Sequence, residues 1–234
     1  MSHDTTSLER EAQDLLGQYQ GRQLKNKDRL AIPVQQMPAQ DPSVRVGNMD
    51  EVALGYSEAQ VMVEAMRCLQ CPTAPCVQGC PVRIDIPRFI AKAAAGDFAG
   101  SIAVIKEASM LPSVCGRVCP QETQCQEPCT VGKAHKSVDR AVAIGRIERY
   151  VADWEAASGK RSVPAVASPT GKKVGVIGSG PASMTAAADL RRAGHEVVMF
   201  EALHKCGGVL VYGIPEFRLP KRIVQEELDT LTAM

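Results

Sequence analysis

Eight of the nine cysteines of this 234-residue chain lie between residues 68 and 129. They form two blocks, MRCLQCPTAPCVQGCPV and CGRVCPQETQCQEPC, in which neighbouring cysteines are separated by only two to five residues. A segment this rich in cysteine must either bind metal or form disulfides, and either role dictates how it folds. The cysteines of the two blocks are Cys68, Cys71, Cys76, Cys80, Cys115, Cys119, Cys125 and Cys129.

The compartment favours metal over disulfides. The N-terminus, MSHDTTSLEREAQDLL, lacks the basic-then-apolar layout of a secretory signal, so a cytoplasmic location is the default expectation. Disulfides are rare in that reducing compartment. Two structural zinc sites are the other alternative, but zinc motifs usually pair two Cys-x2-Cys units and this chain has one.

A cysteine followed by proline, as at Cys80, is typical of bacterial ferredoxins, where that cysteine ligates the neighbouring cluster. The pattern therefore predicts two adjacent iron–sulfur clusters. Cys68, Cys71 and Cys76 would hold one of them, and Cys80 would reach across to the other. Cys206 stands apart from both blocks, and we interpret it as a small loop residue.

Overall charge and hydropathy narrow the class of partner. The chain has 27 basic and 26 acidic residues, a formal net charge of +1, which predicts no strong attraction to nucleic acid or to an anionic membrane surface. No stretch approaches the roughly 18 apolar residues of a membrane span. We therefore expect neither a nucleic-acid partner nor a transmembrane segment.

The chain divides into four segments by pattern. Residues 1–55 are polar and proline-punctuated, which predicts an arm with one helix near residues 7–20 and otherwise extended backbone. Residues 56–157 predict an all-α unit around the cysteines, with one helix starting at a capping box on Ser57 and another over 138–154. Residues 158–172 are rich in Gly, Ser and Pro and predict a linker. Residues 173–234 open a βαβ unit, with strands at 173–177 and 196–200 and a helix at 181–193.

The sequence GSGPAS, residues 178–183, lies between the first of these strands and the helix, which is the context of a dinucleotide fingerprint. Gly178 would permit the tight turn, and Gly180 would let the backbone approach a pyrophosphate at the helix N-terminus. Ser183 stands where the fingerprint has its third glycine. Glu201, at the end of the second strand, could bind ribose hydroxyls. The candidate residues are Gly178, Gly180, Pro181, Ala182, Ser183 and Glu201.

The fingerprint alone does not separate FAD from NAD, and an ordinary strand-to-helix turn is the alternative to a nucleotide site.

The chain resembles the small (β) subunit of NADPH-dependent glutamate synthase from about residue 29 to the end. The resemblance is carried by both cysteine blocks and by the segments AIGRIERYVADW, GSGPAS and FEALHKCGGVLVYGIPEFRLPK. The chain is also similar to the N-terminal region of dihydropyrimidine dehydrogenase and to the large subunit of NADH-dependent reduced ferredoxin:NADP oxidoreductase. The resemblance implies an α + α/β fold, in which an all-α double-cluster domain precedes the first βαβ portion of a truncated Rossmann-like FAD-binding domain.

The resemblance further implies two 4Fe-4S clusters, and FAD rather than NAD at the glycine loop. Gly207 and Gly208 would approach the FAD, Glu201 its ribose, and Arg218 would lie near the flavin. Electrons would come from NAD(P)H, bound by a domain absent from this chain. They would leave to a large FMN-containing glutamate synthase subunit or to a ferredoxin-type partner.

In the family one cluster has four cysteine ligands and the other has three cysteines and a residue from the downstream helix. The first set corresponds to Cys68, Cys71, Cys76 and Cys129. The second corresponds to Cys80, Cys119, Cys125 and Glu148 of the segment GRIE. This alignment makes Cys115 a non-ligand. The alternative is ligation by all eight cysteines, with Glu148 a solvated helix residue.

The chain stops at Met234, whereas in the family the FAD domain continues and a separate NAD(P)H domain is inserted within it. We therefore expect a fragment of a longer enzyme, an electron-transfer oxidoreductase module of the glutamate synthase type. Two alternatives stay open. One is a subunit of an electron-bifurcating ferredoxin:NADP oxidoreductase, and the other is a non-catalytic iron–sulfur docking module.

Overall fold

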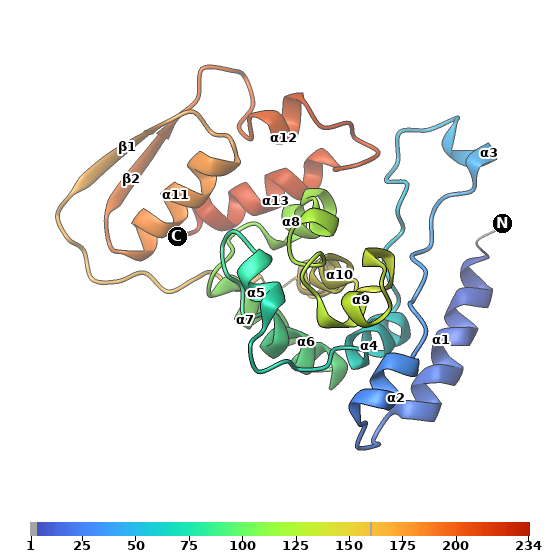
Figure 1. The fold of residues 1–234 in the computed structure, drawn as a ribbon. Coiled ribbons are helices and arrows are strands. Elements are labelled where there is room, and N and C mark those ends of the chain that lie inside the picture. Colours follow the sequence, from blue (N-terminus) through green and yellow to red (C-terminus); the bar gives the residue numbers. More distant parts are fainter. Residues whose placement is uncertain (1–3, 160) are drawn as a thin grey trace.

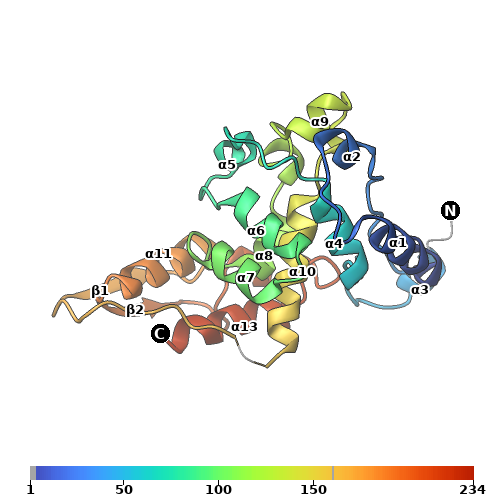
Figure 2. The ribbon, with the colours of Figure 1, turned by 90° about the horizontal axis from the view of Figure 1, so that it is seen from below.

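A computed structural model describes residues 4–159 and 161–234. A bundle of short helices, α4 to α10, lies between an N-terminal arm that carries α1 to α3 and a small α/β part that carries β1, β2 and α11 to α13 (Figure 1). The view from below shows the same order, with α1 at one end of the molecule and the two strands at the other (Figure 2).

The arm contains α1 (Thr5–Tyr19), α2 (Asn26–Ala31) and α3 (Pro42–Arg45). The helix expected near residues 7–20 is confirmed, but the two shorter helices were not predicted. Each has a local start: the Lys25 N–H donates to Asp28 before α2, and Asp41 accepts from the Ser43 N–H before α3. The arm is tied to the bundle, because Arg29 donates to the carbonyls of Met66 and Cys68, each at 2.9 Å.

The bundle is built from seven α-helices and two 3₁₀ turns among the described residues. The capping box at Ser57 is confirmed at the start of α4, and the Asp97 side chain caps α7 as its sequence position favours. The apolar faces of these helices enclose one core, which includes Phe89, Ile105 and Ile147. The elements are α4 (Glu58–Met66), α5 (Pro75–Gly79), α6 (Ile86–Ala94), α7 (Phe98–Lys106), α8 (Pro112–Val118), α9 (Thr130–Ala134), α10 (Ile144–Ala157), η1 (Gln121–Thr123) and η2 (Val138–Arg140).

A buried ion pair fixes the entry to α10. Glu64 and Arg67 are both shielded from solvent. Glu64 accepts hydrogen bonds from the backbone N–H of Gln35 at 2.8 Å and of Ala143 at 2.9 Å. Arg67 donates to the carbonyl of Ala141 at 2.9 Å.

The prediction of one continuous helix over 138–154 is wrong for this reason. The chain makes a single 3₁₀ turn at Val138–Arg140 and is extended at Ala141 before α10 begins at Ile144. Backbone groups that a helix would use internally are bound instead by the Glu64–Arg67 pair. Val138 and Trp154, the two ends of the predicted helix, are 38% and 36% exposed.

The α/β part follows the predicted order: β1 (Lys173–Ile177), α11 (Pro181–Arg192), β2 (Glu196–Phe200), then α12 (Val209–Tyr212) and α13 (Lys221–Thr232). The two strands are parallel and in register from Lys173↔Glu196 to Ile177↔Phe200. Residues 161–172 contain neither helix nor strand. They run along the end of α11, where the Ala167 N–H donates to the Arg192 carbonyl at 2.9 Å.

The α/β part packs directly on the bundle through α8 and α13. Leu111 and Val114 pack in one apolar cluster with Ile223 and Val224. Beside that cluster the Ser113 N–H donates to the buried Glu227 carboxylate at 3.0 Å. Among the described residues, no helix is both long and apolar enough to cross a membrane.

Candidate functional site

Four cysteines from three chain segments line one small cavity. Cys68 follows the end of α4, Cys71 lies in the next loop, Cys76 is in α5, and Cys129 immediately precedes α9. The remaining walls are mostly apolar and come from α6, α9 and the entry to α10. These four are the residues that the family resemblance implies for the first cluster.

The thiols of this set lie in a poorly solvated place. Burial, with the charges of neighbouring thiolates of the same set as a lesser cause, raises the pKa of Cys68 to about 11 and that of Cys76 to about 12. Four thiolates together would repel one another strongly without a compensating cation. A metal centre supplies that positive charge, because metal coordination deprotonates a thiol.

A second group forms around Cys125. Burial raises the pKa of its thiol to about 12, and the charges of Glu148, Cys80 and Cys119 follow as the next causes. These are the four residues that the resemblance implies for the second cluster. They come from the loop after α5, the segment after α8, and α10.

Glu148 is the unusual member of this group. Its side chain is buried, with 6% of the residue exposed. Among the described residues its Oε1 has no hydrogen-bond partner. Burial, with the charge of Cys119 next, raises the pKa of the carboxyl well above its usual range. A buried carboxylate oxygen without a partner is costly, so its presence calls for an ion or a ligand that the polypeptide does not provide.

Both groups therefore fit an iron–sulfur cluster in donor chemistry. In the part of the chain that the structure describes, no three His, Cys, Asp or Glu side chains are spaced to hold a single metal ion. The requirement of a 4Fe-4S cluster is different, since its four protein ligands bind four separate irons.

Cys115 lies beside the second group. Its thiol donates a hydrogen bond to Cys119, which raises the pKa of Cys115 and lowers that of Cys119 to about 7. The Oγ of Ser109 lies 3.9 Å from the sulfur of Cys115. Cys115 and Glu148 thus both adjoin Cys119, and proximity alone does not choose between the two ligand schemes.

A close helix crossing brings Glu148 to the cysteines. A Cβ added at Gly116 of α8 would lie 2.6 Å from the backbone nitrogen of Arg149 and 2.7 Å from its Cα. Only glycine permits this close approach of α8 to α10. The crossing places Glu148, which directly precedes Arg149, next to the segment between Cys115 and Cys119. Sequence reasoning missed the role of Gly116, and its place inside the motif CGRVC was the available signal.

The glycine loop has the geometry of a phosphate site. Gly178 has a φ of +85°, and Gly180 is the N-cap of α11. A Cβ added at Gly180 would meet no atom within 4 Å, so open space lies in front of the helix N-terminus. Pro181, Ala182 and Ser183 form the first turn of α11.

Ser179 links this loop to Glu201. Its N–H donates to Glu201 Oε2 at 3.1 Å, and its hydroxyl donates to the same oxygen. That hydroxyl hydrogen bond is the main reason that the pKa of Glu201 is lowered. The hydroxyl also accepts from the Gly207 N–H at 3.0 Å. Sequence reasoning did not include Ser179 among the site residues, although it is the group that organises them.

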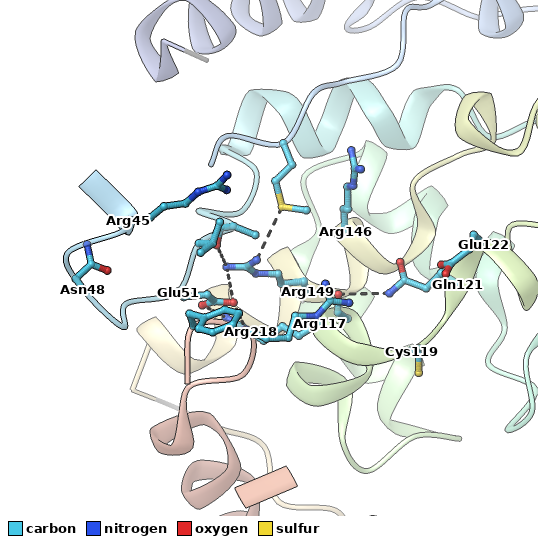
Figure 3. A pocket seen from close by; sticks show the side chains of 15 residues that line it. Arg45, Asn48, Glu51, Arg117, Cys119, Gln121, Glu122, Arg146, Arg149 and Arg218 are labelled. Atoms are coloured by element: carbon cyan, nitrogen blue, oxygen red, sulfur yellow. Dashed lines mark hydrogen bonds and ion pairs between the residues drawn. The ribbon is translucent and has the colours of Figure 1, made fainter. Parts of the chain in front are cut away.

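The Gly207–Gly208 turn is pressed against the glycine loop, because a Cβ at Gly208 would lie 2.8 Å from the Cα of Gly180. Both glycines have positive φ angles. Arg218 lies elsewhere: it lines a larger hollow together with Cys119 (Figure 3). The structure therefore brings together every predicted nucleotide-site residue except Arg218, which lines a different cavity.

Comparison with known proteins gives two family matches. A family described as dihydropyrimidine dehydrogenase domain II, 4Fe-4S cluster, matches residues 45–160, and one described as an NAD(P)-binding Rossmann-like domain matches residues 176–213. The chain is 36% identical over 186 residues to a protein of Salmonella typhimurium, the NAD-dependent dihydropyrimidine dehydrogenase subunit PreT, covering 80% of this chain and 44% of that protein.

A second relative has the same level of identity. The chain is 36% identical over 197 residues to the NADPH glutamate synthase small chain of Escherichia coli K12, covering 84% of this chain and 41% of the relative. It is 37% identical over 193 residues to the putative oxidoreductase UacF of the same strain, covering 82% and 30%. The chain thus spans less than half the length of these relatives.

Proposed function

This chain belongs to the family of iron–sulfur oxidoreductase subunits that includes the glutamate synthase small chain and PreT, and on this basis we propose that it is an electron-transfer module with two 4Fe-4S clusters and an FAD site. One observation carries the proposal. The candidate ligands gather into two groups of four, and the non-cysteine member of the second has a buried carboxylate oxygen with no partner in the described chain.

The first group, Cys68, Cys71, Cys76 and Cys129, would hold one cluster between apolar walls that keep water away. Glu148 would hold the second cluster with the three remaining cysteines, Cys80, Cys119 and Cys125. When bound, the clusters supply one-electron transfer between the nucleotide-binding part and a partner. The helical unit at residues 56–157 would be the cluster domain, joined through the linker at 158–172 to the nucleotide-binding part at 173–234.

The second group is the one that adjoins the nucleotide-binding part. Ser113 of α8 binds Glu227 of α13, and the charge of Glu227 in turn raises the pKa of Glu148. This contact supports a direct relation between the nucleotide site and the Glu148 group.

For the nucleotide we propose FAD, with its pyrophosphate at the N-terminus of α11. Gly180 would permit close approach of the phosphates, and the Gly207–Gly208 turn would form the wall beside them. Glu201 would bind the ribose. Ser179, which donates to Glu201 and accepts from the Gly207 N–H, would hold the carboxylate and the Gly207–Gly208 turn in place. The Rossmann-like family match supports a dinucleotide without naming which one. Reduction by NAD(P)H would require a further domain.

The comparisons favour two partner types equally, because the identities to PreT and to the glutamate synthase small chain are the same. One is a large glutamate synthase subunit, and the other is the second subunit of an NAD-dependent dihydropyrimidine dehydrogenase. The free state of all nine cysteines suits the reducing cytoplasm, which we propose as the location.

Anaerobic purification followed by iron and acid-labile sulfide analysis tests this function. Two 4Fe-4S clusters predict about eight irons and about eight sulfides per chain and a brown protein. Zinc in place of iron, without acid-labile sulfide, would reject the proposal. Titration with FAD, followed by flavin fluorescence, and with NAD, followed by calorimetry, then separates the two nucleotides.

A further inference from the structure

A cavity of about 590 Å³ lies where the arm, the bundle and the loop before α13 meet (Figure 3). It is separate from the glycine loop, none of whose residues lines it. Its volume falls within the range of roughly 300–1,000 Å³ that is usual for small-molecule sites. Its main chemical feature is a set of arginines from four chain segments, namely Arg45, Arg117, Arg146, Arg149 and Arg218.

Two of these arginines form a fixed floor. The side chains of Arg117 and Arg149 are only 2% and 5% exposed, and both are paired with the same acids. Glu51 accepts from Arg117 at 2.8 Å and lies 3.1 Å from Arg149. Asp153 lies 2.9 Å from Arg117 and 3.4 Å from Arg149. The charge of these two arginines is therefore largely compensated.

The other three arginines lack such compensation. Among the described residues, no carboxylate oxygen lies within 4.0 Å of the guanidinium nitrogens of Arg45, Arg146 or Arg218. Arg146 has only neutral partners, the Gln35 carbonyl at 3.4 Å and the Tyr56 hydroxyl at 3.3 Å. Glu122 also lines the cavity, and the charge of Arg45 acts on the nearby Asp41. The lining residues still include five arginines against two acids, Glu51 and Glu122, so positive charge is in excess.

The chemistry of the walls defines the ligand. A guanidinium presents a planar set of N–H donors that matches the oxygens of a carboxylate or a phosphate. Met37 and Phe217 add apolar surface to the same cavity. We propose that the cavity binds a small organic polyanion bearing phosphate or carboxylate groups, with Arg45 and Arg146 as its principal partners and Arg218 at its side.

Such a ligand would contact three parts of the chain at one point. Arg45 belongs to the arm, Arg146 to α10, and Arg218 to the loop before α13. The direct tie between arm and loop at this point is the Val52 N–H to the Phe217 carbonyl, at 3.0 Å. An anion bound to all three arginines would stabilise the folded chain, and the stabilisation would rise with the logarithm of its concentration once that concentration exceeds the Kd.

The test is calorimetric titration of the anaerobically purified chain with inorganic pyrophosphate and with citrate, at matched ionic strength. We expect saturable binding of at least one anion. Tighter binding of pyrophosphate would identify a phosphate ligand, and tighter binding of citrate a carboxylate ligand. The double variant Arg45→Gln/Arg146→Gln should lose at least about tenfold in affinity, because removing even one charge-assisted contact weakens binding by about that factor.

Arg83→Gln is the matched control, because Arg83 is exposed and lies outside the cavity. It should bind both anions as the unmodified chain does. Arg146→Lys, which keeps the charge, should retain binding better than Arg146→Gln if charge rather than folding is responsible. Unsaturable binding of both anions, or equal affinity in the double variant, would overturn the proposal. Loss of anion binding on saturation with FAD would also overturn it, since the cavity would then belong to the nucleotide site.

Discussion

Replacement of Glu64 by glutamine should destabilise the chain far more than its small change in size implies. Glu64 is fully buried, and its two oxygens accept from Gln35, Ala143 and Arg67. Glutamine offers one acceptor oxygen and places an amide N–H₂ where the carboxylate had its second. One backbone N–H then faces another donor, and the buried Arg67 loses its counter-charge.

The magnitude follows from these two losses. A buried donor without an acceptor costs about 1–3 kcal/mol. Removing one partner of a buried ion pair costs about 3–5 kcal/mol, a figure that already contains part of the first loss. Arg67 keeps hydrogen bonds to the carbonyls of Ile32, Arg140 and Ala141, which limits the damage. We therefore expect Glu64→Gln to lower the free energy of unfolding by about 3–5 kcal/mol.

Anaerobic urea denaturation, followed by far-ultraviolet circular dichroism, measures this change. A lower midpoint with an unchanged dependence of the unfolding free energy on urea concentration reports a loss of stability. Glu58→Gln is the control, because Glu58 is exposed in the first turn of the same helix and should cost at most about 1 kcal/mol. Iron content should fall in Glu64→Gln as well, since Arg67 directly precedes Cys68. If both variants unfold at the same urea concentration, the buried pair does not organise the entry to α10 as we have argued.

Three further predictions concern the candidate sites. Cys115→Ser should keep both clusters, whereas Glu148→Ala should reduce the iron content from about eight toward about four per chain; the reverse result in iron analysis would favour ligation by eight cysteines. Gly180→Val should weaken FAD binding in a fluorescence titration, and because Gly180 has a φ of −66° and free space around it, the fold itself should tolerate valine. In the cluster-free chain, the rate at which iodoacetamide modifies Cys119 should reach half its maximum near pH 7, because the pKa of Cys119 is about 7. The rate should fall at lower pH, where less of the thiol is ionised. Replacing Cys115 by alanine should move that midpoint upward, and an unchanged profile by mass spectrometry would contradict the role of the hydrogen bond.

Local signals predicted much of the fold. The capping box at Ser57 and the tight turn at Gly178 form where the sequence predicts them. These features depend on groups a few residues apart, so the sequence contains all the necessary partners. The strands at 173–177 and 196–200 were predicted to the residue for the same reason.

Features that depend on distant partners were not predictable in this way. The late start of α10 depends on Glu64 and Arg67, which lie more than seventy residues earlier in the chain. The crossing at Gly116 depends on the backbone of Arg149, and the position of Arg218 depends on the arm. Each is a contact between segments that no periodicity relates. Even the glycine inside CGRVC, which signals a close approach, does not say which segment approaches it.

Cys68 and Cys129 lie about sixty residues apart in the chain, yet they line the same cavity. The first site would therefore stabilise the fold as well as carry electrons. A cluster bound there would join the two ends of the cysteine-rich segment as a cross-link does. By the loop-closure relation used for disulfides, such a link lowers the entropy of the unfolded chain by an amount equivalent to roughly 4 kcal/mol. Destruction of the cluster by oxygen would remove that constraint. Oxidative damage at this site would therefore shorten the lifetime of the protein against proteolysis, as well as interrupt electron flow.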